Sequence, residues 1–192
     1  FGGSLFLIVP LIYARYQQYD IKKIFRFNRV PLNVIILSIL IGMALTFLCD
    51  ELDRILNIFF PLPDWLNEQM ESLRSENTFE LVLIVIGAVF VAAIAEEGLF
   101  RGFLQYSLEQ HGDITRAVIF SSITWTMIHM NLYWAIQLFL MSIVIGYMAW
   151  RTNSIIPAMI IHGINNLIGV LYLNFNLDPY MQWYEWKDHV SP

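Results

Sequence analysis

Residues 95–101 read AEEGLFR, and they end a long apolar run that begins at Phe79. Two adjacent acids and an arginine are costly at membrane depth, so such residues usually serve a function there. On a helix, Glu97 and Arg101 lie four residues apart on one face, a spacing that suits an ion pair. Glu96 points about 100° away from Glu97. The pattern therefore predicts one neutralised acid and one acid left free for chemistry.

The composition indicates a membrane protein. The 192 residues are 57% hydrophobic and 14% charged, with a mean hydropathy of +0.57, whereas soluble domains carry about 25% charged residues. We expect one membrane domain over residues 1–192, an all-α bundle of transmembrane helices around a polar cavity. No basic patch of useful size is present, which argues against nucleic acid as a partner. Cys49 is the only cysteine, which excludes an internal disulfide.

Residues 1–49 are expected to hold N-terminal spans and a basic loop. The loop, Arg15–Arg29, has five basic residues against the single acid Asp20, and the positive-inside rule places it in the cytoplasm. Pro31 then opens a span that we expect to run from Leu32 to about Leu48. We expect a multi-pass protein of a bacterial plasma membrane.

Residues 50–78 form an acidic link that we place on the outer side. Within it, four apolar residues recur at helical spacing: Trp65, Leu66, Met70 and Leu73. This piece is typical either of an amphipathic helix at the membrane interface or of a solvated loop packed on the bundle. Residues 174–192 form a tail whose aromatic residues favour an anchor at the headgroups: Trp183, Tyr184 and Trp186.

The catalytic core is expected over about residues 79–173, in four apolar helices separated by short polar turns. The first runs from Phe79 to about Glu109. The expected spans after it are Ile114–His129, Ala135–Trp150, and one that starts within Asn153–Pro157 and continues to about Leu173.

Two further polar pairs interrupt these apolar helices. Trp125 precedes His129 by four residues, and His162 precedes Asn166 by four, so each pair shares one helix face. Glu96 and His129 are almost equally far from the turn near Gly112, and an antiparallel hairpin therefore sets them side by side. The spacing of His162 from the next turn matches that depth. We expect Glu96, His129, His162 and Asn166 to meet inside the membrane.

These groups indicate hydrolysis by an activated water. A glutamate and a histidine can hold and deprotonate water, and a second histidine with an amide can donate hydrogen bonds to an oxyanion. Ser121 and Ser122 look like ordinary polar residues of a helix interface. Glu96, His129 and His162 could also hold Zn²⁺ with an open position for water. The sequence leaves metal-bound and metal-free water equally open.

Three motifs in this order resemble the CAAX protease and bacteriocin-processing family of intramembrane endopeptidases, which includes the type II CAAX prenyl endopeptidases. The motifs are Glu-Glu-x-x-x-Arg (Glu96, Glu97, Arg101), aromatic-x-x-x-His (Trp125, His129) and His-x-x-x-Asn (His162, Asn166). The resemblance covers Phe79 to about Leu173, and the second motif usually begins with Phe, where this chain has Trp125.

The resemblance implies a role for each of these residues. Glu96 would be the general base, acting on water together with His129. His162 and Asn166 would form the oxyanion site. Glu97 and Arg101 would be a supporting pair, with Trp125 as an aromatic packing residue. The substrate would be a peptide or protein, with or without an attached lipid.

Other functions also use such groups. Intramembrane Glu and His chains serve proton relays, so a proton- or ion-coupled transporter is the first alternative, although no inverted repeat is visible. A non-catalytic membrane scaffold of the same fold is the second. For each motif alone, a structural ion pair or an interhelical hydrogen bond is a sufficient explanation. The alignment of all three in depth favours an enzyme.

Overall fold

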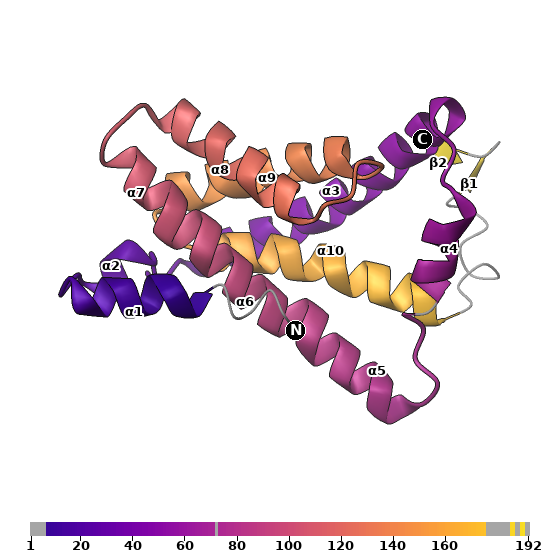
Figure 1. The fold of residues 1–192 in the computed structure, drawn as a ribbon, viewed down its shortest axis with the longest axis horizontal. Helices are drawn as coiled ribbons and strands as arrows, with labels where there is room; N and C mark the ends of the chain where they lie inside the picture. The colour runs from indigo at the N-terminus through magenta and orange to yellow at the C-terminus, as the bar shows by residue number, and fades with distance from the viewer. Residues whose placement is uncertain (1–6, 72, 176–184, 187–188, 191–192) are drawn as a thin grey trace.

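The computed structural model describes residues 7–71, 73–175, 185–186 and 189–190, which are helical apart from one short strand pair (Figure 1). The all-α class is confirmed. In chain order the elements are α1 (Ile8–Tyr16), α2 (Ile21–Ile24), α3 (Leu32–Phe59), α4 (Asp64–Glu71), α5 (Thr78–Ile84), η2 (Val85–Val91), α6 (Ala92–Glu97), η3 (Gly98–Leu104), α7 (Gln105–Glu109), α8 (Ile114–Ile128), α9 (Ala135–Thr152), α10 (Ile156–Asn174), β1 (Glu185–Trp186) and β2 (His189–Val190).

Four of the described helices are long and apolar enough to cross a membrane: α3, the continuous helix from α5 to α7, α9 and α10. In their most apolar windows only 17–33% of the residues are buried inside the protein. The remaining apolar side chains face outward over an area far larger than a soluble monomer tolerates. Lipid is the solvent that such a surface requires.

One sequence-based expectation about helix length was wrong. The helix that begins at Leu32 continues to Phe59 instead of ending near Leu48. An ion pair between Asp50 and Arg54, one turn apart at 3.2 Å, supports the charged extension. The expected helix Ile114–His129 is present as the 15-residue helix α8, which at about 22 Å is shorter than the hydrocarbon core.

The long helix from Thr78 to Glu109 is one rod with two π-helical segments, η2 and η3. Asn77 caps its start by accepting the backbone N–H of Glu80 at 3.0 Å. Segment η3 begins at Gly98, directly after the two glutamates. π-helical turns inside α-helices are frequent at functional sites because they change which side chains share a face.

Helix α10 holds the bundle together, because it packs against α3, α9, η2 and α6 (Figure 1). Helix α8 packs against α9 and returns alongside η3 and α7. The buried core lies between these helices, and its residues are Phe100, Trp125, Met141, Ile145, Met148, Ala149, Ala158 and Ile161. The polar side chains described below are therefore fixed by the best-packed part of the molecule.

The basic loop is fastened to the ends of two later helices. Arg26 forms a buried ion pair with Glu109 at the end of α7. The Asn28 amide donates to the carbonyl of Asn153 at 2.6 Å, and Ser154 donates to the carbonyl of Asn28 at 2.6 Å. The loop, the end of α7 and the α9–α10 turn thus share one side of the bundle.

The acidic link contains helix α4, so a helix is present where either a helix or a loop was expected. Leu66 is buried at 1% exposure, while Trp65 is 58% exposed, and the Trp65 ring meets that of Tyr133 at 6.5 Å. In the expected aromatic tail, Trp183 and Tyr184 lie outside the described residues. The backbone of Glu185–Trp186 pairs antiparallel with His189–Val190.

We predict that Gly102→Ala destabilises the protein by about 1–3 kcal/mol, the usual cost of overpacking. A Cβ at Gly102 in η3 would lie 3.0 Å from the Cα of Phe25, and this backbone cannot rotate out of the way. Unfolding by denaturant in one detergent measures the effect. Gly169→Ala in α10 is the matched control, because its Cβ would meet nothing within 4 Å. Equal stability of the two variants would contradict the prediction.

Candidate active site

Glu96 and His129 face each other across two helices. Glu96 lies near the end of α6, and His129 is the residue that caps α8. Glu96 Oε2 and His129 Nε2 are 3.9 Å apart, and the two side chains are 18% and 30% exposed. The sequence prediction that a hairpin brings them together is therefore confirmed.

The orientation of the His129 ring is fixed by its own helix. His129 Nδ1 lies 2.8 Å from the backbone carbonyl oxygen of Trp125. Since a carbonyl oxygen only accepts, Nδ1 carries the hydrogen, and in the neutral ring Nε2 is an acceptor that faces Glu96. The 3.9 Å gap is too long for a direct hydrogen bond. A polar gap of this length suits a water molecule in contact with both groups.

Behind this pair lies a sealed cluster of charges. Arg101 Nη1 donates to Glu97 Oε1 at 2.9 Å, which confirms the predicted ion pair, and both side chains are 0% exposed. His162 Nδ1 lies 2.8 Å from the same Glu97 oxygen and its side chain is 4% exposed. The sequence reasoning placed His162 with Glu96, whereas the structure joins it directly to the neighbouring acid.

Asn166 lies one turn beyond His162 on α10. Its amide nitrogen Nδ2 donates to the backbone carbonyl of Ala88 in η2 at 2.8 Å. This bond ties α10 to the long helix and leaves the second Nδ2 hydrogen and the side-chain oxygen of Asn166 for other partners. The structure thus brings Glu96 and His129 together, and it joins His162 and Asn166 to neighbouring groups instead.

Trp125 connects the exposed pair with the sealed cluster. Its indole Nε1–H donates to Glu96 Oε2 at 2.8 Å. Its ring lies 4.4 Å from the His129 ring and 5.6 Å from the His162 ring, centroid to centroid. The guanidinium carbon of Arg101 lies 4.9 Å from the indole centroid, a cation–π distance. A residue expected to be a packing aromatic is also a hydrogen-bond donor to the free acid.

Sequence reasoning missed Ser142 on α9. Arg101 Nη2 donates to its hydroxyl oxygen at 2.6 Å and to its carbonyl oxygen at 3.3 Å. A lone serine in an apolar helix is a weak signal, because such residues commonly bond within helix interfaces. Ser121 does so here, donating to the carbonyl of Phe100 at 3.1 Å. The guanidinium of Arg101 has five N–H donors, more than Glu97 alone can accept, and this was the only reason to look for a further acceptor.

The geometry does not favour the zinc alternative. Over residues 7–71 and 73–175, no three His, Cys, Asp or Glu side chains are grouped so that they could hold a metal ion. His162 turns its Nδ1 to Glu97, which is itself held by Arg101. The ligand set Glu96, His129 and His162 does not fit as placed, and we derive no step through a metal.

All seven candidate residues lie within one matched segment. Residues 78–168 match the family model described as type II CAAX prenyl endopeptidase Rce1-like. This segment is therefore similar to the Rce1-like family. Together with the four apolar helices, the match indicates an integral membrane protein. No curated protein and no solved structure gives a significant match.

We predict that Arg101→Leu costs roughly 3–5 kcal/mol of folding stability, because it leaves the buried Glu97 carboxylate without its cation. The double variant Glu97→Gln, Arg101→Leu is expected to recover part of this loss, since it removes both charges. Arg151→Leu is the control, because Arg151 is exposed at the end of α9. Denaturant unfolding is the measurement. A single variant as stable as the control would contradict a structural role for the ion pair.

Proposed function

We propose that the protein is an intramembrane endopeptidase that hydrolyses peptide bonds with a water molecule activated by Glu96 and His129. One observation carries the proposal. A carboxylate and an imidazole nitrogen stand 3.9 Å apart in a partly exposed position, while the neighbouring acid is sealed and paired. Glu96 and His129 are therefore spaced for a shared water, whereas Glu97 is buried and paired with Arg101.

In the proposed reaction, Glu96 takes a proton from the water as the water oxygen attacks the carbonyl carbon of the scissile peptide bond. His129 Nε2 holds the same water in line. The attack forms a tetrahedral intermediate with a negative oxygen. Collapse of this intermediate breaks the C–N bond, and the proton held by Glu96 passes to the leaving amine. Water is consumed, and a carboxylic acid and an amine are produced.

His162 and Asn166 are the proposed donors to the negative oxygen. Both lie on one face of α10, four residues apart, and α10 packs directly against α6. The Glu97 carboxylate holds His162 at Nδ1, which leaves Nε2 as the nitrogen available to a substrate, and Nε2 donates when the ring is an imidazolium. Preorganised donors at such a position commonly contribute 10²–10³ in rate each.

The proposed substrate is a peptide segment that enters from the bilayer. The name of the matching family refers to a CAAX prenyl endopeptidase, so a lipidated and an unmodified peptide of the same sequence are both needed in the assay. We also propose that the basic loop, Arg15–Arg29, faces the cytoplasm of a bacterial cell. Its attachment to Glu109 and Asn153 would place both of those helix ends on the cytoplasmic side.

We predict that Glu96→Gln abolishes peptide cleavage by the purified protein in lipid, because an amide cannot accept the proton of water. Chromatographic detection of new peptide termini is the measurement, and melting curves show whether the variant is folded. Glu68→Gln, an exposed residue of α4, is the control and is expected to cleave normally.

Cleavage by a folded Glu96→Gln variant at the normal rate would overturn the mechanism. Proton flux into liposomes without cleavage of any peptide would instead support the transporter. If neither activity is found with either peptide, the scaffold becomes the better description.

We further predict that Trp125→Phe lowers kcat about 10-fold to 100-fold while KM changes little. Phenylalanine keeps an aromatic ring between the two histidines but lacks the N–H that holds Glu96 at 2.8 Å, and a hydrogen bond to a charged group is worth about 1.5–3 kcal/mol. Trp150→Phe is the control, since Trp150 contacts Tyr147 outside the site. An unchanged kcat would remove Trp125 from the positioning of the base.

A further inference from the structure

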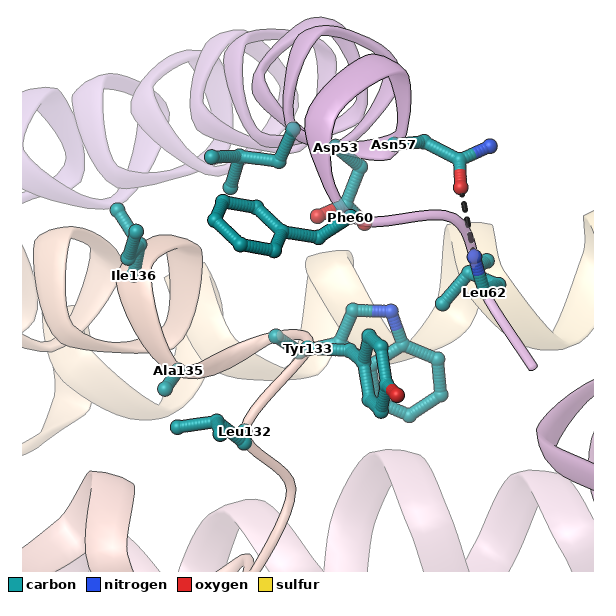
Figure 2. A pocket seen from close by; sticks show the side chains of 10 residues that line it. Asp53, Asn57, Phe60, Leu62, Leu132, Tyr133, Ala135 and Ile136 are labelled. Carbon is teal, nitrogen blue, oxygen red and sulfur yellow. Dashed lines mark hydrogen bonds between the residues drawn. The ribbon is translucent and has the colours of Figure 1, made fainter.

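A pocket of about 390 Å³ lies away from the candidate catalytic residues, between the end of α3 and the start of α9 (Figure 2). None of the candidate catalytic residues lines it. Its walls are mainly apolar and aromatic, and include Leu56, Phe60, Leu132, Trp134 and Ile136. Volume and lining are those of a site for a small molecule.

One carboxylate interrupts this apolar wall. Asp53 is the only acid among the described residues that line the pocket, and Figure 2 shows it on α3 above Tyr133. Gln137 Nε2 donates to Asp53 Oδ2 at 2.7 Å. None of the ion pairs seen in the described part of the chain gives Asp53 a basic partner. A partly buried carboxylate with a single neutral donor is under-compensated, and a cation would complete it.

Asn57, the amide side chain in the described lining, already accepts a hydrogen bond within the protein. Asn57 Oδ1 accepts the backbone N–H of Leu62 at 2.8 Å and so closes the turn after α3 (Figure 2). Asp53 is therefore the charged side chain that can bind the polar group of a ligand in this pocket. The rings of Phe60, Tyr133 and Trp134 can add a cation–π contribution beside it.

The position of the pocket fits a ligand that is partly in lipid. It lies at the end of α3 opposite the basic loop, and α3 has 28 residues, about 42 Å of helix, which exceeds the hydrocarbon core. Asp53 is therefore expected near the headgroups, with apolar walls around it. An aliphatic amine partitions into a bilayer in this way, with its charge at the interface and its chain in the apolar layer.

We propose that this pocket binds a small amphiphilic amine, whose ammonium group pairs with the Asp53 carboxylate and whose apolar chain lies along Leu56, Phe60 and Leu132. The site is separate from the proposed peptidase reaction and does not depend on it. It is joined to the candidate active site by a short turn. His129 caps α8, and the Asn131 side chain accepts the N–H groups of Tyr133 and Trp134 at 3.0 and 3.3 Å.

The test uses the full chain in nanodiscs of phosphatidylcholine, with 10-bromodecan-1-amine as the probe. Bromine quenches tryptophan fluorescence on contact, and the part of the quenching that Trp134→Phe removes reports on the pocket. The neutral control is 10-bromodecan-1-ol, and concentrations are compared as mole fractions in the bilayer. We expect the amine to reach half-maximal quenching of Trp134 at roughly tenfold lower concentration than the alcohol, the change expected from one added ion pair.

Asp53→Asn is expected to bring the amine to the level of the alcohol. Asp50→Asn is the matched control, because it removes the same charge one turn earlier on α3 from a residue that does not line the pocket. It should leave the difference between the probes intact. If Asp53→Asn does not fold, Ala135→Phe provides the second variant. It fills the pocket while keeping the carboxylate and should abolish Trp134 quenching by both probes.

Three results would overturn the proposal. The first is equal quenching by amine and alcohol in the unaltered protein. The second is an amine preference that survives in folded Asp53→Asn. The third is quenching that is reduced neither by Trp134→Phe nor by Ala135→Phe. None of these measurements uses peptide cleavage, so their outcome is independent of the proposed peptidase activity.

Discussion

A guanidinium group sealed inside a membrane protein needs a counter-charge and hydrogen-bond acceptors, and Arg101 finds them by drawing four helices together. It pairs with Glu97 from α6, donates to Ser142 on α9 and stacks against Trp125 on α8. Through the shared Glu97 oxygen it also fixes His162 on α10. An uncompensated charge there would cost several kcal/mol. Because each helix supplies one partner, the charges of the cluster are balanced only when these helices pack in this arrangement.

The same constraint separates the two adjacent glutamates. Glu97 is fully buried, where its carboxylate pairs with Arg101 and lies beside His162. Glu96 points to the partly exposed His129 and accepts one hydrogen bond, from Trp125. Neighbouring residues of a helix differ by about 100° in direction, and that turn is enough to put one carboxylate into a structural role and the other into a position for chemistry. The proposed base is therefore supported by a buried cluster whose acid is already paired with a cation.

Much of this arrangement could be predicted because it depends on spacing. The four-residue interval of Glu97 and Arg101, and the equal distances of Glu96 and His129 from one turn, both follow from regular helices. The partner of His162 could not be predicted, because Glu96 and Glu97 are one residue apart and a π-helical segment begins at Gly98, which alters the directions that a regular helix would give. The extension of α3 past Asp50 was missed because hydropathy alone ends a span at the first acids, whereas Arg54 stabilises the helix beyond them.

The bond between His162 and Glu97 has a consequence for the proposed oxyanion site. Glu97 Oε1 accepts from Arg101 and lies 2.8 Å from His162 Nδ1, so Nδ1 must be the donor and carry a hydrogen. In the neutral ring Nε2 is then an acceptor and repels a negative oxygen. His162 can serve the proposed reaction only as an imidazolium, which would add one positive charge beside the developing oxyanion. The inner cluster would then act as more than a support, because its carboxylate would stabilise the very cation that the transition state requires.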